Sequence, residues 1–137
     1  MKILVCTDGS KNAEMAVKFS AKFAKNYRAD LMILRVIKHE TSMEKPVFDE
    51  YGDEYHRAKN IIKSAEGIIS QIAPDITVKN RIAVGPVSAE IIRIAESEKF
   101  DCIVIGTRGN RGLRRMLLGS VADEVILYAH CPVVVVR

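Results

Sequence analysis

The most regular feature of the chain is an alternation between short apolar runs and longer segments whose apolar residues recur every three or four positions. Five short runs are present, at residues 3–6, 31–37, 76–84, 102–105 and 133–136. Runs of this length, rich in Val and Ile, predict β-strands. The second run is continuous enough for burial on both faces, although Arg35 interrupts it. The alternating third run predicts an edge strand with one wetter face.

The longer segments predict four helices between these strands. The first has small apolar residues from 13 to 24 and Ser10 as its N-cap, and the second has apolar residues from 58 to 72 and stops at Pro74. Gly85-Pro86 opens the third helix, which ends at Phe100. Residues 38–55 carry many charges and no clear period, so we expect an exposed loop there.

The fourth helix is predicted to begin near Ser120. The spacing from Ser120 to Asp123 makes a capping box, and Val121, Val125 and Ala129 are expected on its inner face. The final apolar run, which begins after Pro132, then follows as the last strand.

Strands that alternate with helices predict βαβ units around a parallel sheet. With right-handed crossovers, we expect an α/β fold with a single doubly wound, open, five-stranded parallel sheet, helices on both faces and a Rossmann-like strand order of 3-2-1-4-5. Ligands on such sheets bind beyond the carboxyl ends of strands where the winding reverses. If the first and fourth strands are neighbours, the loops at Asp8 and Gly106 face one another.

Composition supports one domain over residues 1–137. The chain has 48% hydrophobic and 28% charged residues and a formal net charge of +4, which argue for a core and against disorder. The densest cationic segment suits a few phosphates better than a nucleic-acid track, or it is only a solvated loop; its members are Arg108, Arg111, Arg114 and Arg115. We therefore expect no nucleic-acid partner.

Cysteine and histidine spacing gives no sign of a metal site on the protein itself. Cys6, Cys102 and Cys131 lie in or beside apolar runs, which predicts small buried hydrophobic residues in a reducing compartment. The amino terminus lacks the long apolar stretch of a signal peptide, and no run approaches the length of a membrane span. We expect a soluble, cytoplasmic protein that does not associate with membranes.

Glycines cluster after the fourth predicted strand and again before the fourth helix. Gly106 and Gly109 allow close backbone approach, and a phosphate would find free N–H groups at Gly119, Ser120 and Val121. The alternative is structural: the first two glycines serve a tight turn, and Ser120 caps its helix. Spacing alone leaves both interpretations open.

The segment Gly106-x2-Gly109-x9-Gly119-Ser120 resembles the nucleotide-binding signature of ATP-binding universal stress proteins. Residues 101–106, 114–121 and 130–136 are similar to that family as well. The resemblance covers essentially the whole chain and is weakest between residues 38 and 55. It implies an adenine-nucleotide ligand, most simply ATP.

The resemblance also implies roles for individual residues. Adenine and ribose would lie over Cys6, Thr7 and Asp8, with the aspartate near ribose or metal-bridged oxygens, and the backbone of Val36 would hydrogen-bond adenine. Ribose and phosphates would follow Ile105, Gly106, Arg108 and Gly109, and the outer phosphates would meet Gly119, Ser120 and Val121. Mg²⁺ or Mn²⁺ would be held through the phosphates, near Asp8. From the residues alone, an alternative is open for each: Asp8 can belong to a capping turn, and Val36 can be a core valine.

The last strand, Val133–Val136, would be an exposed apolar edge in a monomer, and such edges invite pairing. The resemblance implies a homodimer in which these strands pair. We expect a regulatory module in stress response that binds ATP and acts on an unknown protein partner. The alternatives are a slow ATP hydrolase or phosphotransfer protein, for which no GxxxxGK[ST] loop is present, and a nucleotide-free dimeric scaffold.

Overall fold

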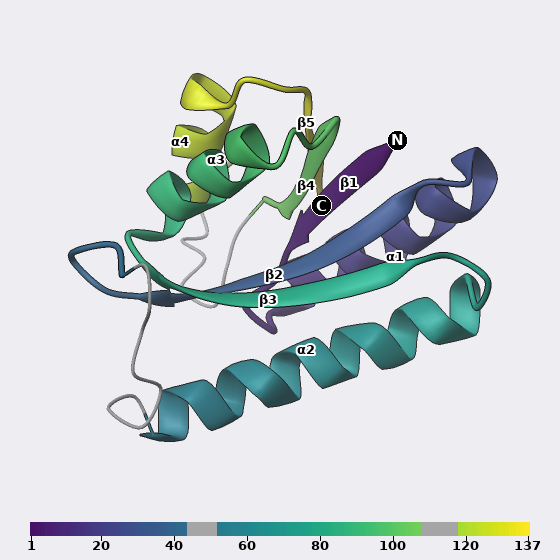
Figure 1. Cartoon of the computed structure of the whole chain (residues 1–137), viewed down its shortest axis with the longest axis horizontal. Coiled ribbons are helices and arrows are strands. Elements are labelled where there is room, and N and C mark those ends of the chain that lie inside the picture. Colours follow the sequence, from purple (N-terminus) through teal and green to yellow (C-terminus); the bar gives the residue numbers. More distant parts are fainter. Residues whose placement is uncertain (44–51, 108–117) are drawn as a thin grey trace.

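The computed structural model describes residues 1–43, 52–107 and 118–137. Its centre is one parallel sheet of five strands in the order β3-β2-β1-β4-β5 (Figure 1). The strands are β1 (Lys2–Cys6), β2 (Asp30–Lys38), β3 (Val78–Gly85), β4 (Cys102–Gly106) and β5 (Val133–Val136). The predicted fold class and strand order are confirmed, and β1 and β4 are neighbours.

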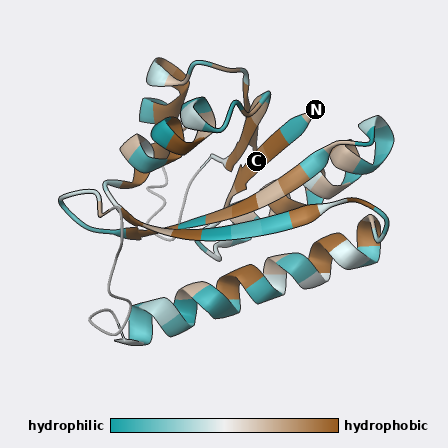
Figure 2. Cartoon of the chain, viewed as in Figure 1, coloured by the Kyte–Doolittle hydropathy of each residue, from teal (hydrophilic) through white to brown (hydrophobic). Residues whose placement is uncertain are grey.

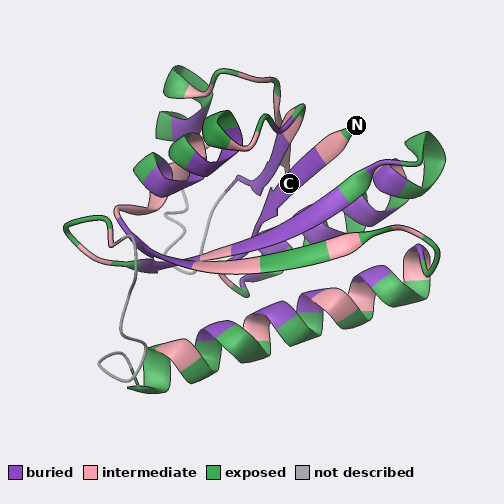
Figure 3. Cartoon of the chain, viewed as in Figure 1, coloured by how far each residue is buried: buried purple, intermediate pink, exposed green. Residues whose placement is uncertain are grey.

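Four helices cover the two faces of the sheet (Figure 1). They are α1 (Lys11–Tyr27), α2 (Gly52–Ile72), α3 (Val87–Ser97) and α4 (Ser120–Tyr128). Residues of α1 and α2 share one buried cluster with β1 and β2, residues of α3 and α4 share a second on the opposite face, and Ile37, Ala58 and Val84 form a smaller third cluster. Strands β1 and β4, which lie inside the sheet, are therefore buried on both sides beyond their first residue. The edge strand β3, in contrast, has exposed residues near its start (Figures 2 and 3).

Local chemistry explains where the helices begin and end. The Ser10 side chain accepts a hydrogen bond from the Ala13 N–H at 3.2 Å, which confirms the predicted N-cap of α1. That helix ends at Arg28, whose left-handed backbone donates back to Ala24. Pro86 precedes α3 as its N-cap residue, where a missing N–H costs nothing.

Several predicted boundaries are wrong by a few residues. The expected loop over 38–55 is too long, because β2 continues to Lys38 and α2 already begins at Gly52. Asp53 and Glu54 stand in the first turn of α2, where acidic side chains meet the positive end of the helix dipole. Two of the charged residues that indicated a loop, Asp53 and Glu54, therefore belong to the start of a helix.

The predicted capping box at Ser120 is not formed. Gly119 is the N-cap of α4 and has no side-chain capping bond, and the Asp123 N–H donates to the Gly119 carbonyl at 3.0 Å. The predicted inner face is confirmed, because Val125 is buried and the partly buried Val121 and Ala129 pack against the same cluster; Ala122, which was not predicted, is buried as well.

The cysteines are buried to different extents. Cys6 is buried, and burial raises its pKa to about 12. Cys102 and Cys131 are only partly buried, which corrects the expectation for these two, and they pack on opposite faces of the sheet. Burial also raises the pKa of both thiols. No helix among the described residues is both long and apolar enough to cross a membrane.

Candidate functional site

The carboxyl ends of β1 and β4 meet at one edge of the sheet. Val5 pairs with Val104, so Cys6 and Thr7 continue from one strand where Ile105 and Gly106 end the other. Cys6, Thr7 and Ile105 are buried, and so is Thr107, which follows β4. The structure thus brings together the two predicted loops, at the point where the strand order reverses.

A backbone hydrogen bond brings the start of α4 to the same edge. The Gly119 N–H donates to the carbonyl of Thr107. This corrects the expectation of a free N–H group at Gly119 and leaves those of Ser120 and Val121. Gly119 and Val121 are partly buried and Ser120 is exposed at the first position of the helix. The N–H groups at the start of a helix have no partner within it, and they favour an anion. Of the remaining predicted residues, Arg108 and Gly109 lie outside the described part of the chain.

Gly106 has a structural role that neither sequence interpretation included. Its backbone is not in the left-handed region, so a tight turn is not what demands glycine here. A Cβ atom at this position would stand 2.8 Å from the Asn12 carbonyl carbon, 2.9 Å from the Asn12 oxygen and 3.0 Å from the Ala13 nitrogen. Glycine is required because the end of β4 touches the first turn of α1, which fixes the two loops against each other.

The turn after β1 is organised by its own side chains. The Ser10 N–H donates to Asp8 Oδ1 at 2.9 Å, and the Gly9 N–H donates to Thr7 Oγ1 at 3.2 Å. Gly9 itself has a φ of 80°, which a residue with a side chain rarely adopts. The interpretation of Asp8 as part of a capping turn is therefore confirmed, because one of its carboxylate oxygens accepts a hydrogen bond within the turn. A carboxylate accepts several hydrogen bonds, so a ligand role is compatible with this turn.

Val36 is a core residue whose backbone faces the end of β1. Along β2 the even-numbered residues point their backbone groups towards β1, because the Asp30 N–H donates to Met1 and Leu34 accepts from Thr7. Val36 is the next even residue, and the paired part of β1 ends at Cys6. Its side chain is buried among residues of the α3 and α4 face. Both sequence interpretations of Val36 are thus structurally compatible.

Sequence reasoning treated Arg35 only as an interruption, yet it lies at this edge. Its Nη1 donates to the Val36 carbonyl at 2.7 Å, and its Nε is buried with no hydrogen-bond partner among the described residues. Burial lowers the pKa of Arg35, and the negative charges of Asp8 and Glu54 oppose that shift. A single cation inside an otherwise apolar strand was the sequence signal that could have identified it.

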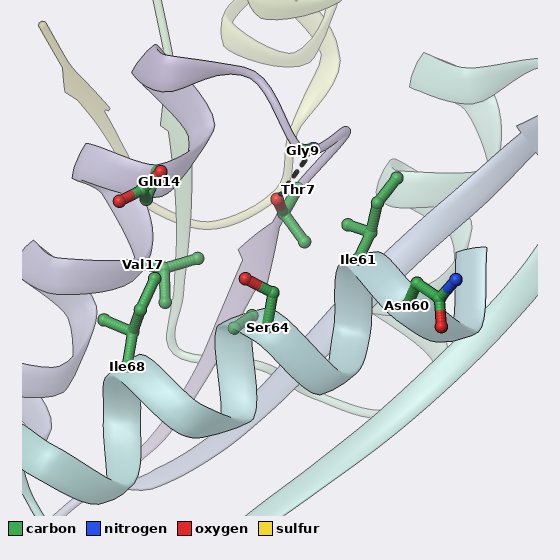
Figure 4. Close-up of a pocket in the computed structure, with 9 residues that line it drawn as sticks. Thr7, Gly9, Glu14, Val17, Asn60, Ile61, Ser64 and Ile68 are labelled. Atoms are coloured by element: carbon green, nitrogen blue, oxygen red, sulfur yellow. Dashed lines mark hydrogen bonds between the residues drawn. The ribbon is translucent and has the colours of Figure 1, made fainter. Parts of the chain in front are cut away.

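A cavity of about 240 Å³ lies beside this edge, between α1 and α2 (Figure 4). Thr7 and Gly9 form its end nearest the sheet, and its side walls come from Glu14 and Val17 of α1 and from Asn60, Ile61, Ser64, Ala65 and Ile68 of α2. It shares Thr7 and Gly9 with the edge but does not include β4 or α4. Among the described residues no group of three His, Cys, Asp or Glu side chains is placed to hold a metal ion.

The strand order and the helices on both faces place the chain in the class of doubly wound α/β proteins. In that class, ligands generally bind beyond the carboxyl ends of the parallel strands. The sequence matches the universal stress protein family over residues 1–137, and the chain belongs to that family. A universal stress protein of Methanocaldococcus jannaschii, MJ0531, is 35% identical over 138 residues, which are 99% of this chain and 81% of the relative.

Solved structures show the same fold. Universal stress protein UspA from Lactobacillus plantarum has a TM-score of 0.85 at 26% identity and covers 100% of this chain and 97% of its own. MJ0577, also of M. jannaschii, has a TM-score of 0.81 at 33% identity and covers 98% and 94%.

Three more distant structures of this fold contain adenine nucleotides. A universal stress protein in complex with cAMP is 23% identical, with a TM-score of 0.74 and coverage of 100% and 96%. The Archaeoglobus fulgidus protein in complex with dAMP is 24% identical, with a TM-score of 0.74 and coverage of 100% and 98%. An Arabidopsis thaliana family member with AMP bound is 18% identical, with a TM-score of 0.63 and coverage of 99% and 90%.

Proposed function

We propose that residues 1–137 form one ATP-binding domain that acts as a regulatory module, in which the bound nucleotide changes the choice of protein partner. The observation that carries the proposal is the hydrogen bond from Gly119 to Thr107, because it places the first amides of α4 beside the end of β4. The glycine-serine signature and the nucleotide complexes of the same fold support the assignment.

Each part of the nucleotide has a matching region in this proposal. Adenine lies over Cys6 and Thr7 and meets the Val36 backbone, and the ribose lies at Asp8. The sugar and inner phosphates follow residues 105–109, including Ile105, Gly106, Arg108 and Gly109. The outer phosphates reach the start of α4 at Gly119, Ser120 and Val121, where the N–H groups of Ser120 and Val121 remain for an anion because that of Gly119 already bonds to Thr107, and the helix dipole attracts negative charge.

A divalent cation fits this arrangement only as part of a nucleotide complex. Asp8 is the one acidic side chain among the predicted site residues, and the described residues hold no cluster of three ligands. Mg²⁺ is usually held by one or two carboxylates together with phosphate oxygens and water. In the proposed complex, Asp8 is the residue of this chain placed to supply such a carboxylate.

The position of Ser120 allows a sharp test. Proline is favoured at the first position of a helix, and Gly119 already has the extended backbone, φ −74° and ψ 164°, that a following proline requires. Ser120→Pro should therefore keep the fold while removing both the N–H and the hydroxyl. The matched variant Ser120→Ala removes the hydroxyl alone.

The experiment is calorimetric titration of the three proteins with ATP and AMP. Loss of a hydrogen bond to a charged group costs about 1.5–3 kcal/mol, so Ser120→Pro should weaken ATP binding by roughly 10- to 150-fold and AMP binding far less. Ser120→Ala should retain more ATP affinity than Ser120→Pro. Absence of ATP binding to the unaltered protein at millimolar concentration would contradict the proposal and favour the nucleotide-free scaffold.

We also propose a homodimer through β5. The Ile103 N–H donates to Pro132 and the Thr107 N–H to Val136, so even-numbered residues of β5 bond to β4 and the N–H groups of Val133 and Val135 point outward. The helix that precedes β5 along the chain, α4, exposes the large apolar side chains of Ile126, Leu127 and Tyr128. A second copy that adds its own β5 would satisfy the edge and cover this surface.

Two proline variants distinguish the edge from the interior of the sheet. Val135→Pro removes an outward N–H, so the protein should remain folded and elute as a monomer on sizing. Val134→Pro removes an N–H that bonds within the subunit, so it should lower the melting temperature instead. A folded Val135→Pro protein that is still dimeric would refute pairing through β5.

A further inference from the structure

Arg35 places a cation directly beside the predicted adenine contact. The neighbouring odd-numbered residues of β2, Ile33 and Ile37, pack on the α1 and α2 side of the sheet, so the Arg35 side chain leaves the strand on that side. It nevertheless returns to the plane of the sheet, because Nη1 donates to the Val36 carbonyl at 2.7 Å. The guanidinium therefore lies next to the Val36 carbonyl. Cys6, the last residue of β1 that pairs with β2, pairs with Leu34, so this carbonyl lies past the end of the paired part of β1.

Three polar groups consequently follow one another along this edge. The guanidinium of Arg35 is a donor, the Val36 carbonyl is an acceptor and the Val36 N–H is a donor. The carbonyl has two lone pairs, so accepting from Arg35 leaves one position for a ligand. The two Nη atoms of a guanidinium carry four N–H donors, so the single bond from Nη1 to Val36 leaves donors there for a ligand, whereas Nε is buried.

Adenine has the complementary order of groups along one side of its ring. N7 is an acceptor, the N6 amino group is a donor, and N1 is an acceptor. Guanine presents the acceptors N7 and O6 and then a donor at N1. Its O6 would face the Val36 carbonyl, acceptor against acceptor, and its N1–H would face the Val36 N–H, donor against donor. Matching a donor, an acceptor and a donor therefore selects adenine and leaves its N7 for the guanidinium.

The charges around Arg35 keep the cation at this place. The carboxylates of Asp8, after β1, and of Glu54, in the first turn of α2, both act on the guanidinium electrostatically. An arginine side chain also keeps its proton at any physiological pH. The donor is thus permanent, and it is held between two elements that border the site.

We propose that Arg35 is a specificity-determining residue of the nucleotide site, and that its guanidinium donates a hydrogen bond to N7 of an adenine whose N6 and N1 meet the backbone of Val36. The proposal rests on the proposed function. The proposal adds the Arg35 side chain to the recognition of adenine, which otherwise uses only the main chain of Val36.

The test compares ATP with 7-deaza-ATP, in which a C–H group replaces N7, by calorimetric titration. The unaltered protein should bind 7-deaza-ATP about tenfold or more weakly than ATP, because a hydrogen bond to a charged group is lost. Arg35→Met, which keeps an apolar stem of similar reach, should bind the two nucleotides with equal affinity. Lys38→Met removes an equal charge from the exposed end of the same strand and should keep the difference.

The outcomes separate this proposal from the one on which it rests. If ATP binds and 7-deaza-ATP binds equally well to the unaltered protein, the role of Arg35 is refuted and nucleotide binding stands. If Arg35→Met still discriminates between the two nucleotides, another group reads N7 and the role of Arg35 is again refuted. If neither nucleotide binds to the unaltered protein, both proposals fail.

Discussion

Gly106 offers the most direct test of how the two loops of the site are held together. Gly106→Ala would add a Cβ atom within 3.0 Å of three backbone atoms, all from Asn12 and Ala13 in the first turn of α1. Backbone cannot rotate away as a long side chain does, so α1 and the end of β4 must separate. The N-cap of α1 at Ser10 lies in the same turn and would be disturbed as well.

The size of the effect follows from this geometry. Overpacking of a well-packed region typically costs about 1–3 kcal/mol. With an unfolding entropy of about 2.1 cal/mol/K per residue, each kcal/mol lowers the melting temperature of a chain of this length by roughly 3–4 °C. We therefore expect Gly106→Ala to melt roughly 3–10 °C below the unaltered protein in the absence of nucleotide.

Gly67→Ala is the matched control, because it makes the same chemical change at an exposed position within α2 where nothing lies within 4 Å of the added Cβ. Alanine in a helix interior is favoured over glycine by about 0.5–1 kcal/mol, so this variant should melt slightly higher. Thermal unfolding followed by circular dichroism measures both. Equal melting temperatures for Gly106→Ala and the unaltered protein would refute the close approach of β4 to α1.

Three further predictions concern local chemistry. Ser10→Ala should lower the free energy of unfolding by about 1 kcal/mol in chemical denaturation, and Ser10→Asp, which keeps an acceptor, should largely preserve it; equal losses would argue against capping. Burial raises the pKa of Cys6 from 9.0 to about 12, so the unfolded chain releases this proton first and stability should fall as pH rises above about 9. Cys6→Ala should show a shallower fall between pH 8 and 10.5, and an unchanged slope would count against a buried thiol. Burial alone would raise the pKa of Glu90, but hydrogen bonds from Arg93 and Ser42 and the charge of Arg93 lower it below 4.5. Its stabilising contribution should therefore be present above about pH 4.5 and be lost as pH falls, and Glu90→Gln should unfold with a weaker acid dependence in a pH series of melts.

The order and type of the elements could be predicted because they depend on periodicity along the chain. Strands β1 and β2 are buried on both faces over most of their length, and the spacing of small residues in α1 and of isoleucines in α2 matches the stripe that each helix buries. Helix starts were less predictable. Gly119 and Ser120 are adjacent residues that both favour an N-cap, and a shift of one residue decides which of them leads α4.

The chemistry of the site was only partly accessible from sequence. The loops at Asp8 and Gly106 could be placed at one edge from topology alone. The contact that demands glycine at 106 could not, because it joins β4 to a turn more than ninety positions earlier in the chain. The role of Arg35 was hidden for a similar reason: only the folded side chain shows that it bends back to its own strand.

The bond from Gly119 to Thr107 holds the first turn of α4 against the end of β4 through main-chain atoms alone. A contact between an N–H group and a carbonyl does not depend on which side chains the two residues carry. In the proposed site, ligand preference can therefore change by substitution of side chains while the helix and the sheet keep their relative position.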